Sequence, residues 1–320
     1  LNGLVHTPEA IPRLTASFLG HYGVQLFVFL SAYGLTKSFH RAVPVYGHFL
    51  RGRLDRVYFT FLLALVAWAV TKGAAFGLLG PLKVLYWNWE ALALKVLLVA
   101  NLVPGQALAL VGPWWFLPFV FQFYLLFPLL YRLPTTYGDW TLIGVAAAGV
   151  VASFVVNEHI NVGILVFATP LGHLPEICLG VWMARRETMR LPRAVVFLAA
   201  VGLVLGNYER HVWYLSHLSA LILMLAAWRW ARPVIRQQRE VNSVFAFLGG
   251  ISMQLFLVNG FLRDLLLPWA RSGDSELRAL GLSVLSLGLS VCVALAIRWA
   301  EAIVRRWVTD RVSREGPTRA

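Results

Sequence analysis

Two histidines near the start of the chain, His6 and His21, have the chemistry of a general base. A neutral imidazole, with a pKa of about 6.5, can take the proton of a hydroxyl group while its oxygen attacks an electrophile. By position alone, each is a solvated histidine at the edge of an apolar stretch. A catalytic role therefore depends on what the surrounding residues indicate.

Three arginines, Arg51, Arg53 and Arg56, form a cluster that could bind phosphate. A guanidinium group holds a phosphate through two parallel hydrogen bonds. The cluster stands between two apolar stretches, and basic residues in such a place also orient a membrane protein by staying on the cytoplasmic side. The two roles are compatible, so the sequence predicts a membrane anchor that can also hold a phosphorylated ligand.

Polar side chains inside apolar stretches form a third group. Gln122 and Tyr124 lie in one stretch, and Glu176, with His173 one turn before it, lies in another. Glu176 is the only acid that we identify inside an apolar stretch. Because a polar group at membrane depth is costly without a partner, we expect these side chains to bind a ligand or one another.

The composition indicates a membrane protein. Of the 320 residues, 59% are hydrophobic and only 13% are charged, whereas a typical soluble domain has about 25% charged residues. Mean hydropathy is +0.68. The net charge of +13 lies in short loops, where it fits lipid headgroups and membrane orientation better than a nucleic acid. We therefore expect a lipid bilayer as partner and no nucleic acid.

Apolar stretches of spanning length predict an all-α, polytopic integral membrane helix bundle. The predicted spans are 22–39, 57–71, 114–131, 140–156, 164–184, 194–207, 212–230, 243–262 and 279–304. The first six residues look like the end of a further span whose beginning is absent. This gives about nine complete spans plus a remnant of a first span, or ten in an intact chain. In the connection 79–113, Pro and Gly favour an interfacial or re-entrant helix.

The basic residues predict the orientation of these spans. When successive loops are placed on alternate sides of the membrane, 20 of the 28 Lys and Arg residues fall on one side and 8 on the other. We expect the richer side, with the C-terminus, to face the cytoplasm of a bacterial cell whose inner membrane holds the protein. We assign residues 1–312 to one transmembrane domain and 313–320 to a short cytoplasmic tail.

The cysteines and short motifs exclude several kinds of chemistry. Cys178 and Cys292 both fall inside apolar stretches, so we expect core thiols rather than a disulfide or a metal pair. The chain contains no CxxC, HExxH, Walker A or GxSxG motif. No metal is therefore expected.

Several motifs occur in the order that is typical of one membrane family. Gly23–Tyr33, GVQLFVFLSAY, resembles the GV-x-LFFxLSGF signature of the acyltransferase-3 family, and Arg53–Arg56, RLDR, resembles its cytoplasmic RxxR segment. Further matches are the helix 112–128 with its QFYLL sequence, LPEICLG at 174–180 and GISMQLFLVN at 250–259. Each motif is degenerate, and their shared order over nearly the whole chain makes the resemblance specific.

The resemblance implies roles for the residues introduced above. His6 stands where the family has its catalytic histidine, 17 residues before Gly23, so we rank it ahead of His21. The arginine cluster, above all Arg53 and Arg56, would hold the phosphates of acyl-coenzyme A (acyl-CoA). The remaining assignments are Glu176 and Tyr124 as catalytic residues, Arg51 as a third coenzyme ligand, and Trp115, Gln122, Asn259 and His21 as substrate-binding residues.

Two positions depart from the family's pattern. One branch of the family carries a Glu-Glu pair where this chain has Val120 and Phe121, and the histidine of the last motif is Asn259 here. Asparagine can hold a hydrogen bond but cannot titrate at neutral pH. We therefore expect Asn259 to be structural or substrate-binding rather than a base.

As a whole, the resemblance implies a membrane O-acyltransferase. It would take an acyl group, expected to be acetyl, from cytoplasmic acyl-CoA, and the thioester would reach His6 through the helix bundle. The acceptor would be a hydroxyl group of a cell-surface or lipid-linked glycan. Two alternatives stay open at this point: a polysaccharide exporter or flippase, and a catalytically inactive membrane scaffold.

Overall fold

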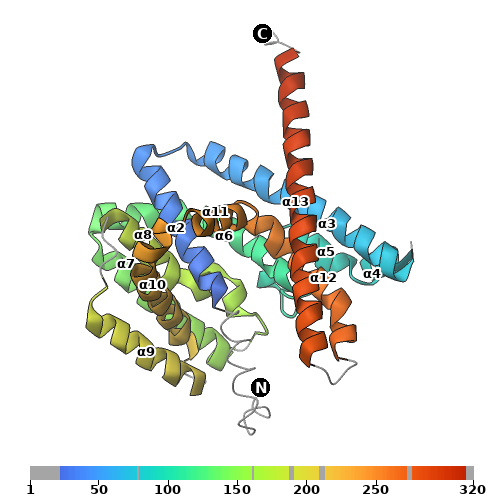
Figure 1. Cartoon of the computed structure of the whole chain (residues 1–320). Helices are drawn as coiled ribbons and strands as arrows, with labels where there is room; N and C mark the ends of the chain where they lie inside the picture. Colours follow the sequence, from blue (N-terminus) through green and yellow to red (C-terminus); the bar gives the residue numbers. More distant parts are fainter. Residues whose placement is uncertain are drawn as a thin grey trace. The chain divides into compact units, whose positions relative to one another are not determined.

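The computed structural model describes residues 22–77, 79–160, 162–186, 191–208, 213–271 and 276–314. Every regular element within these ranges is helical, from α2 (Gly23–Arg41) to α13 (Glu276–Arg314) (Figure 1). The prediction of an all-α protein is therefore confirmed. His6 and His21 lie outside the described residues.

The bounds of the other helices follow in chain order. They are α3 (Tyr46–Phe76), α4 (Leu79–Trp87), α5 (Trp89–Val96), α6 (Phe116–Tyr137), α7 (Trp140–Val155), α8 (Leu174–Arg186), α9 (Arg193–Tyr208), α10 (Trp213–Gln237), α11 (Arg239–Gly250) and α12 (Ser252–Arg271). Short 3-10 turns precede two of them: Gly112–Trp115 leads into α6, and Val166–Ala168 and Pro170–His173 lead into α8.

The chain divides into two compact units. Unit 1 comprises the chain up to His48 together with Gln122–Gln237, and unit 2 comprises Phe49–Phe121 together with the chain from Gln238 onward. The divisions fall near the start of α3, within α6, and between α10 and α11.

Five helical segments of the described chain are long and apolar enough to cross a membrane. They are Tyr46–Phe76, Gly112–Tyr137, Trp140–Ile160, Trp213–Gln237 and Leu277–Trp307. α11 and α12 add a sixth span if they count as one, although their axes are bent by 71°. The protein is thus a multi-pass membrane protein, and the predicted number of nine spans stays a prediction.

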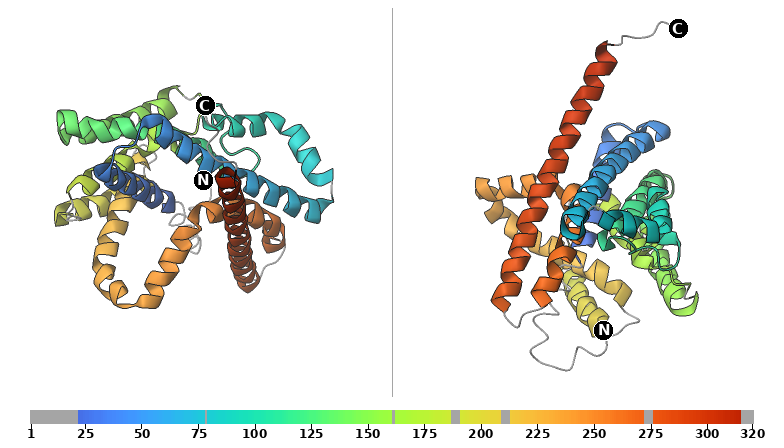
Figure 2. Two further views of the ribbon diagram at one scale, coloured as in Figure 1. Left: turned by 90° about the horizontal axis from the view of Figure 1, so that it is seen from above. Right: turned by 90° about the vertical axis from the view of Figure 1, so that its right-hand side faces the viewer.

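Large apolar side chains on these helices point outward. Val66 on α3 is 60% exposed and Val284 on α13 is 63% exposed. A helix that is apolar on its outer as well as its inner face is typical of a membrane span, because lipid tails solvate such side chains. Figure 2 shows α13 as one long continuous helix.

In unit 1, α8 packs closely on α2 because Gly180 carries no side chain. A Cβ atom at Gly180 would lie 2.7 Å from the carbonyl oxygen of Phe29 and 2.9 Å from Cβ of Ala32. A core of Phe29, Met183, Leu221 and Leu225 joins α2, α8 and α10, and α9 lies against α10. These contacts position the polar ends of the helices.

In unit 2, Trp114 lies at the centre of the packing. Its indole nitrogen donates a hydrogen bond to the carbonyl oxygen of Leu257 on α12 at 3.0 Å. The Trp114 ring packs edge-on against the ring of Phe61 of α3, with the two centroids 5.2 Å apart. α12 lies against α13, so one tryptophan links α3 to the paired helices at the end of the chain.

Three local expectations need correction. α3 begins at Tyr46, eleven residues before the predicted span at 57, so the arginine cluster lies on the membrane helix itself. The predicted span 164–184 is instead two 3-10 turns followed by the 13-residue α8, because Pro170 and Pro175 interrupt a longer helix. Both cysteine thiols are free, as expected, but only Cys178 is buried, whereas Cys292 is exposed on the apolar surface of α13.

Candidate active site

Glu176 lies in the first turn of α8, where the positive end of the helix dipole favours a carboxylate. Its side chain is 1% exposed, and Nδ1 of His173 lies 3.8 Å from its Oε2. Neither carboxylate oxygen has a hydrogen-bond partner among the described residues. A buried carboxylate in this state is costly, so the group depends on a proton, on His173 or on a ligand.

The hydrogen bond of His173 fixes which of its nitrogens carries a proton. Nε2 lies 2.9 Å from the carbonyl oxygen of Phe167, and because a carbonyl only accepts, Nε2 must be the donor. In a neutral imidazole Nδ1 would then present a lone pair to Glu176. The contact between Nδ1 of His173 and Oε2 of Glu176 becomes attractive when one further proton is bound, either on Nδ1 or on the carboxyl group. The pair can therefore hold and release a proton.

A second buried histidine, His217 of α10, lies beside this pair. Its ring is parallel to that of His173, with the centroids 6.3 Å apart and the planes at 14°. The centroid of the Trp213 ring lies 4.4 Å from the centroid of the His217 ring, and the centroid of the Tyr22 ring lies 5.9 Å from it. The structure thus joins Glu176 and His173 to a histidine that is 44 residues away from His173 in the sequence.

Hydrogen bonds around Ser216 hold the first turn of α10 in place. Tyr22 donates its hydroxyl hydrogen to Oγ of Ser216 at 3.1 Å, and Ser216 donates in turn to the carbonyl oxygen of Trp213 at 2.6 Å. The chain of donors connects the residue before α2 to α10. It therefore fixes the helix turn on which His217 stands.

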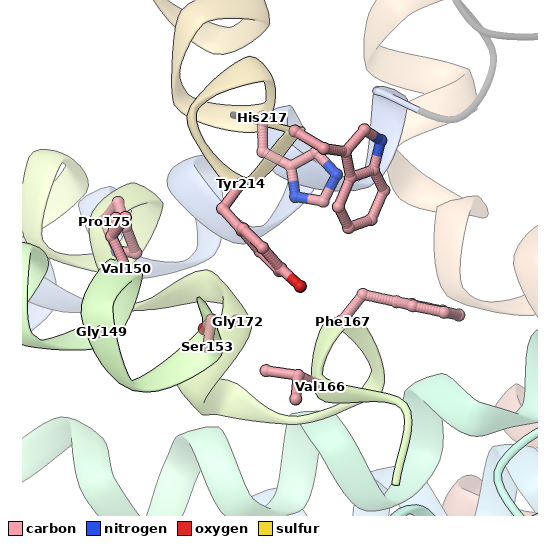
Figure 3. A pocket seen from close by; sticks show the side chains of 10 residues that line it. Gly149, Val150, Ser153, Val166, Phe167, Gly172, Pro175, Tyr214 and His217 are labelled. Atoms are coloured by element: carbon pink, nitrogen blue, oxygen red, sulfur yellow. The ribbon is translucent and has the colours of Figure 1, made fainter. Parts of the chain in front are cut away.

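A pocket opens between α7, the turns before α8 and the start of α10 (Figure 3). The residues of its lining that bear on chemistry are Ser153, Phe167, Trp213, Tyr214 and His217. Oγ of Ser153 is buried and has no hydrogen-bond partner within the described residues. The phenol oxygen of Tyr214 accepts a hydrogen bond from Nδ2 of Asn157 at 2.7 Å.

In unit 2, the three arginines of α3 have different surroundings. Arg51 is exposed and lies 4.0 Å from the carboxylate of Asp55, a weak surface pair. The guanidinium of Arg53 lies over the ring of Phe49, 5.6 Å from its centroid. Arg56 is exposed. Arg53 and Arg56 stand three residues apart on one helix, so they share a face and can act on one anion together.

A buried polar cluster follows one turn after Arg56. Glu301 of α13 accepts two hydrogen bonds, from Oγ1 of Thr60 at 2.5 Å and from Nε2 of Gln254 at 3.0 Å. All three side chains are buried. Glu301 corrects the expectation that Glu176 is the only acid inside an apolar stretch. The cluster ties α3, α12 and α13 together.

The other predicted site residues are spread over the 3-10 turn Gly112–Trp115, α6 and α12. Trp115 is buried against Phe116 and Phe119. Gln122 and Tyr124 are half-buried, and Asn259 is exposed. The structure gives these positions without testing the substrate-binding and catalytic roles, which stay predictions.

Sequence reasoning missed His217, Ser153 and Glu301. The rule that singled out Glu176, a polar group inside an apolar span, applies equally to His217 and Glu301. Ser153 gives no such signal, because a serine in an apolar helix usually donates to the preceding turn of its own helix. Only the packing of α7 against the turns before α8 shows that Ser153 faces a pocket.

The comparisons with known proteins give one match. A family model of acyltransferase-3, described as an acyltransferase domain, matches residues 2–299. The curated proteins and the solved structures contain no match to the chain.

Proposed function

The chain belongs to the acyltransferase-3 family of membrane acyltransferases, and on that premise we propose that it is an O-acyltransferase that uses cytoplasmic acyl-CoA. The acyl group is acetyl in the simplest case. The acceptor is a hydroxyl group of a cell-surface or lipid-linked glycan. The observation that carries the proposal is the family match over residues 2–299, and the buried imidazole–carboxylate pair supports it.

The reaction needs a base and an anion-binding group. The acceptor oxygen attacks the thioester carbonyl, its proton passes to the base, the carbon–sulfur bond breaks, and the coenzyme thiolate leaves and takes up a proton. We assign the base to His6. Glu176, with His173, supplies a group that can exchange one proton, and Tyr124 is a further catalytic candidate. Trp115, Gln122, Asn259 and His21 are proposed to contact substrate.

We assign the coenzyme's phosphates to α3. Arg53 and Arg56 share a helix face, and a guanidinium holds a phosphate through two parallel hydrogen bonds; Arg56 is exposed, whereas Arg53 is half-buried against Phe49. The predicted orientation puts this end of α3 at the cytoplasmic side, where acyl-CoA is available. Arg51 is already near Asp55, so its contribution should be the smallest of the three. The bacterial inner membrane is the proposed location.

The test is acyl-CoA turnover by the purified protein in detergent, without any gradient. An acyltransferase releases free coenzyme thiol and transfers labelled acetyl from acetyl-CoA to an added glycan. The Arg53→Ala/Arg56→Ala double variant serves as the matched control, and it should lose most of this turnover. Absence of thiol release and of transfer would overturn the proposal. Movement of polysaccharide in vesicles, without turnover, would favour the exporter instead.

A further inference from the structure

We propose that Arg305 of α13 is a further phosphate ligand, placed opposite Arg53 and Arg56 of α3, so that the coenzyme binds between the two helices. The inference rests on the proposed function, because acyl-CoA is part of that proposal, and it adds a residue from a second helix. The family match ends at residue 299, so it gives no role to Arg305. α3 from Phe49 onward and α13 both belong to unit 2.

One buried contact fixes the place where α3 and α13 meet. Oγ1 of Thr60 donates to Oε1 of Glu301 at 2.5 Å, and Nε2 of Gln254 donates to Oε2 at 3.0 Å. A buried carboxylate with a donor on each oxygen is held in one geometry. Thr60 and Glu301 are therefore reference points from which the neighbouring residues of both helices can be placed.

On α3, the side that meets Glu301 also carries two of the arginines. Arg56 precedes Thr60 by four residues and Arg53 precedes it by seven, and residues at these spacings lie along one side of an α-helix. Arg51 precedes Thr60 by nine residues, which puts it on the opposite side of the helix, next to Asp55. The side of α3 that is directed toward α13 is thus basic before Thr60.

On α13, the corresponding residue is Arg305. It follows Glu301 by four residues, on the same side of the helix, and it is exposed. Arg306 follows Glu301 by five residues, which turns it away from that side by roughly 140°. Arg298, three residues before Glu301, is engaged in packing, because its Nη1 lies 2.8 Å from the place that a Cβ at Gly250 would occupy. Arg305 is therefore the arginine of α13 that is placed toward α3.

The arginines of the two helices lie on the same side of the contact. α3 and α13 run in opposite directions: Figure 1 shows α3 descending from its first residues and α13 rising to its C-terminus. Residues before Thr60 and residues after Glu301 therefore lie toward the same end. Arg56 and Arg305 each stand about one turn, roughly 5.4 Å along the helix axis, from the contact. A ligand over this end can meet guanidinium groups from both helices.

The coenzyme has a charge distribution that suits such a site. Its anionic groups are a pyrophosphate and a separate 3′-phosphate, so the two arginines of α3 leave part of the charge without a partner. A guanidinium from a second helix adds a bidentate contact from another direction. Lipid headgroups also carry phosphate, and they attract basic residues at the cytoplasmic end of a span. Lipid attraction acts on any exposed arginine of this region, whereas the proposed site depends on position.

Calorimetric titration with coenzyme A tests the inference on purified protein in detergent without added lipid. Arg305→Ala should weaken binding roughly tenfold, as expected for the loss of one charge-assisted contact. Arg305→Lys keeps the charge without the fork and should lose less. Arg306→Ala removes the same charge at the neighbouring exposed position, and this matched control should keep the wild-type affinity. Thermal unfolding of each variant shows that equal amounts of folded protein are compared.

A second measurement tests the placement without any coenzyme. Cys292 is exposed, so the background variant is Cys292→Ser. In that background, a short bis-maleimide should join the two thiols of Arg56→Cys/Arg305→Cys quickly. The thiols of Arg56→Cys/Arg306→Cys should be joined much more slowly. Mass spectrometry of the digested protein detects the linked peptides.

The outcomes separate the added ligand from the proposed function. A loss of affinity in Arg305→Ala but not in Arg306→Ala, with faster cross-linking of the Arg305→Cys pair, supports the inference. Equal affinity in the two alanine variants, or equally fast cross-linking of the two cysteine pairs, overturns it and leaves the proposed function standing. Absence of coenzyme binding by the wild-type protein would overturn the proposed function and the inference together.

Discussion

Unit 1 and unit 2 each bury a glutamate, and the two carboxylates are held in different ways. Glu301 in unit 2 accepts a hydrogen bond at each oxygen, from Thr60 and from Gln254. Glu176 in unit 1 has an imidazole nitrogen at 3.8 Å, and neither of its oxygens is hydrogen-bonded within the described part of the chain. The two side chains are buried to nearly the same extent, since Glu301 is 8% exposed and Glu176 is 1% exposed. Their hydrogen-bond partners therefore distinguish the two carboxylates.

The difference shows which buried acid is available for chemistry. A carboxylate whose lone pairs are occupied by neighbouring donors links helices and stabilises their packing. A carboxylate that lacks such donors keeps its lone pairs for a proton or a ligand, at a cost in folding free energy. We therefore expect Glu301 to matter for stability and Glu176 to matter for turnover.

The largest effect is expected from breaking the helix contact that positions Glu176. Gly180→Leu would force side-chain atoms into the backbone of Phe29, because even a Cβ would lie 2.7 Å from its carbonyl oxygen. Overpacking of this kind costs roughly 1–3 kcal/mol or more. Thermal unfolding and the yield of folded protein measure it. Gly144→Leu, where a Cβ meets nothing within 4 Å, is the control; equal stability of the two variants would contradict the described contact.

The buried Lys95 of unit 2 extends the comparison to a cation. Nζ donates to the carbonyl oxygen of Ala107 at 2.7 Å, and burial lowers the pKa of Lys95 from 10.5 to about 8. Between pH 8 and 10.5 the unfolded chain keeps a proton that the folded protein has lost. Stability should therefore rise over this window, by on the order of 3 kcal/mol in full.

Denaturant unfolding at a series of pH values tests this dependence on Lys95. Lys95→Met should remove the rise between pH 8 and 10.5. Lys83→Met, at an exposed position on α4, should keep it. A rise of the same size in the Lys95→Met variant would show that another group titrates in this window.

The arginines of α3 test whether unit 2 also has a binding role beside its structural glutamate. Arg53→Ala and Arg56→Ala should each weaken acyl-CoA binding by roughly 1.5–3 kcal/mol, the value of a hydrogen bond to a charged group. Calorimetric titration measures the affinity. Binding of a dephosphorylated coenzyme analogue should change less. Arg232→Ala, exposed on α10, is the control, and the same affinity in all variants would reduce the pair to membrane anchors.

The smallest effect is expected at Thr60, which satisfies one oxygen of Glu301. Thr60→Val keeps the shape of the side chain and removes the donor at 2.5 Å, which should cost roughly 1 kcal/mol in unfolding free energy. Thr71→Val removes a hydroxyl that bonds only within its own helix and should cost less. A double-mutant cycle with Glu301→Gln measures the coupling; zero coupling would mean that the two side chains do not interact.

Much of the local structure was predictable because it depends on neighbours in the sequence. Apolar length predicted most helices, and the spacing of His173 and Glu176 predicted their meeting within one turn. The pairing of His173 with His217 depends on how α10 packs against α8, and the sequence carries no sign of that contact. Glu301 was overlooked because it stands close to Arg298, Arg305 and Arg306, where an acid looks like part of a basic, solvated helix end.

The helix breaks were the other limit of the sequence. Hydropathy treats 164–184 as one stretch, whereas prolines and the packing of the turns against α7 divide it. The arginine cluster looked like a link because charges lower the hydropathy of the first turns of α3. The backbone hydrogen bonds of a helix continue through such residues, so α3 includes them.

The most direct measurement compares Glu176→Gln with Glu301→Gln, each assayed for acetyl transfer per folded molecule and for thermal unfolding. Both substitutions keep the side-chain shape and remove the charge. Glu176→Gln should lose about 10²–10⁴-fold in transfer, the usual value of acid–base catalysis, without loss of stability. Glu301→Gln should unfold at a temperature several degrees lower and keep transfer within a few-fold. Full transfer by folded Glu176→Gln, or a greater loss in Glu301→Gln, would contradict the distinction between the two carboxylates.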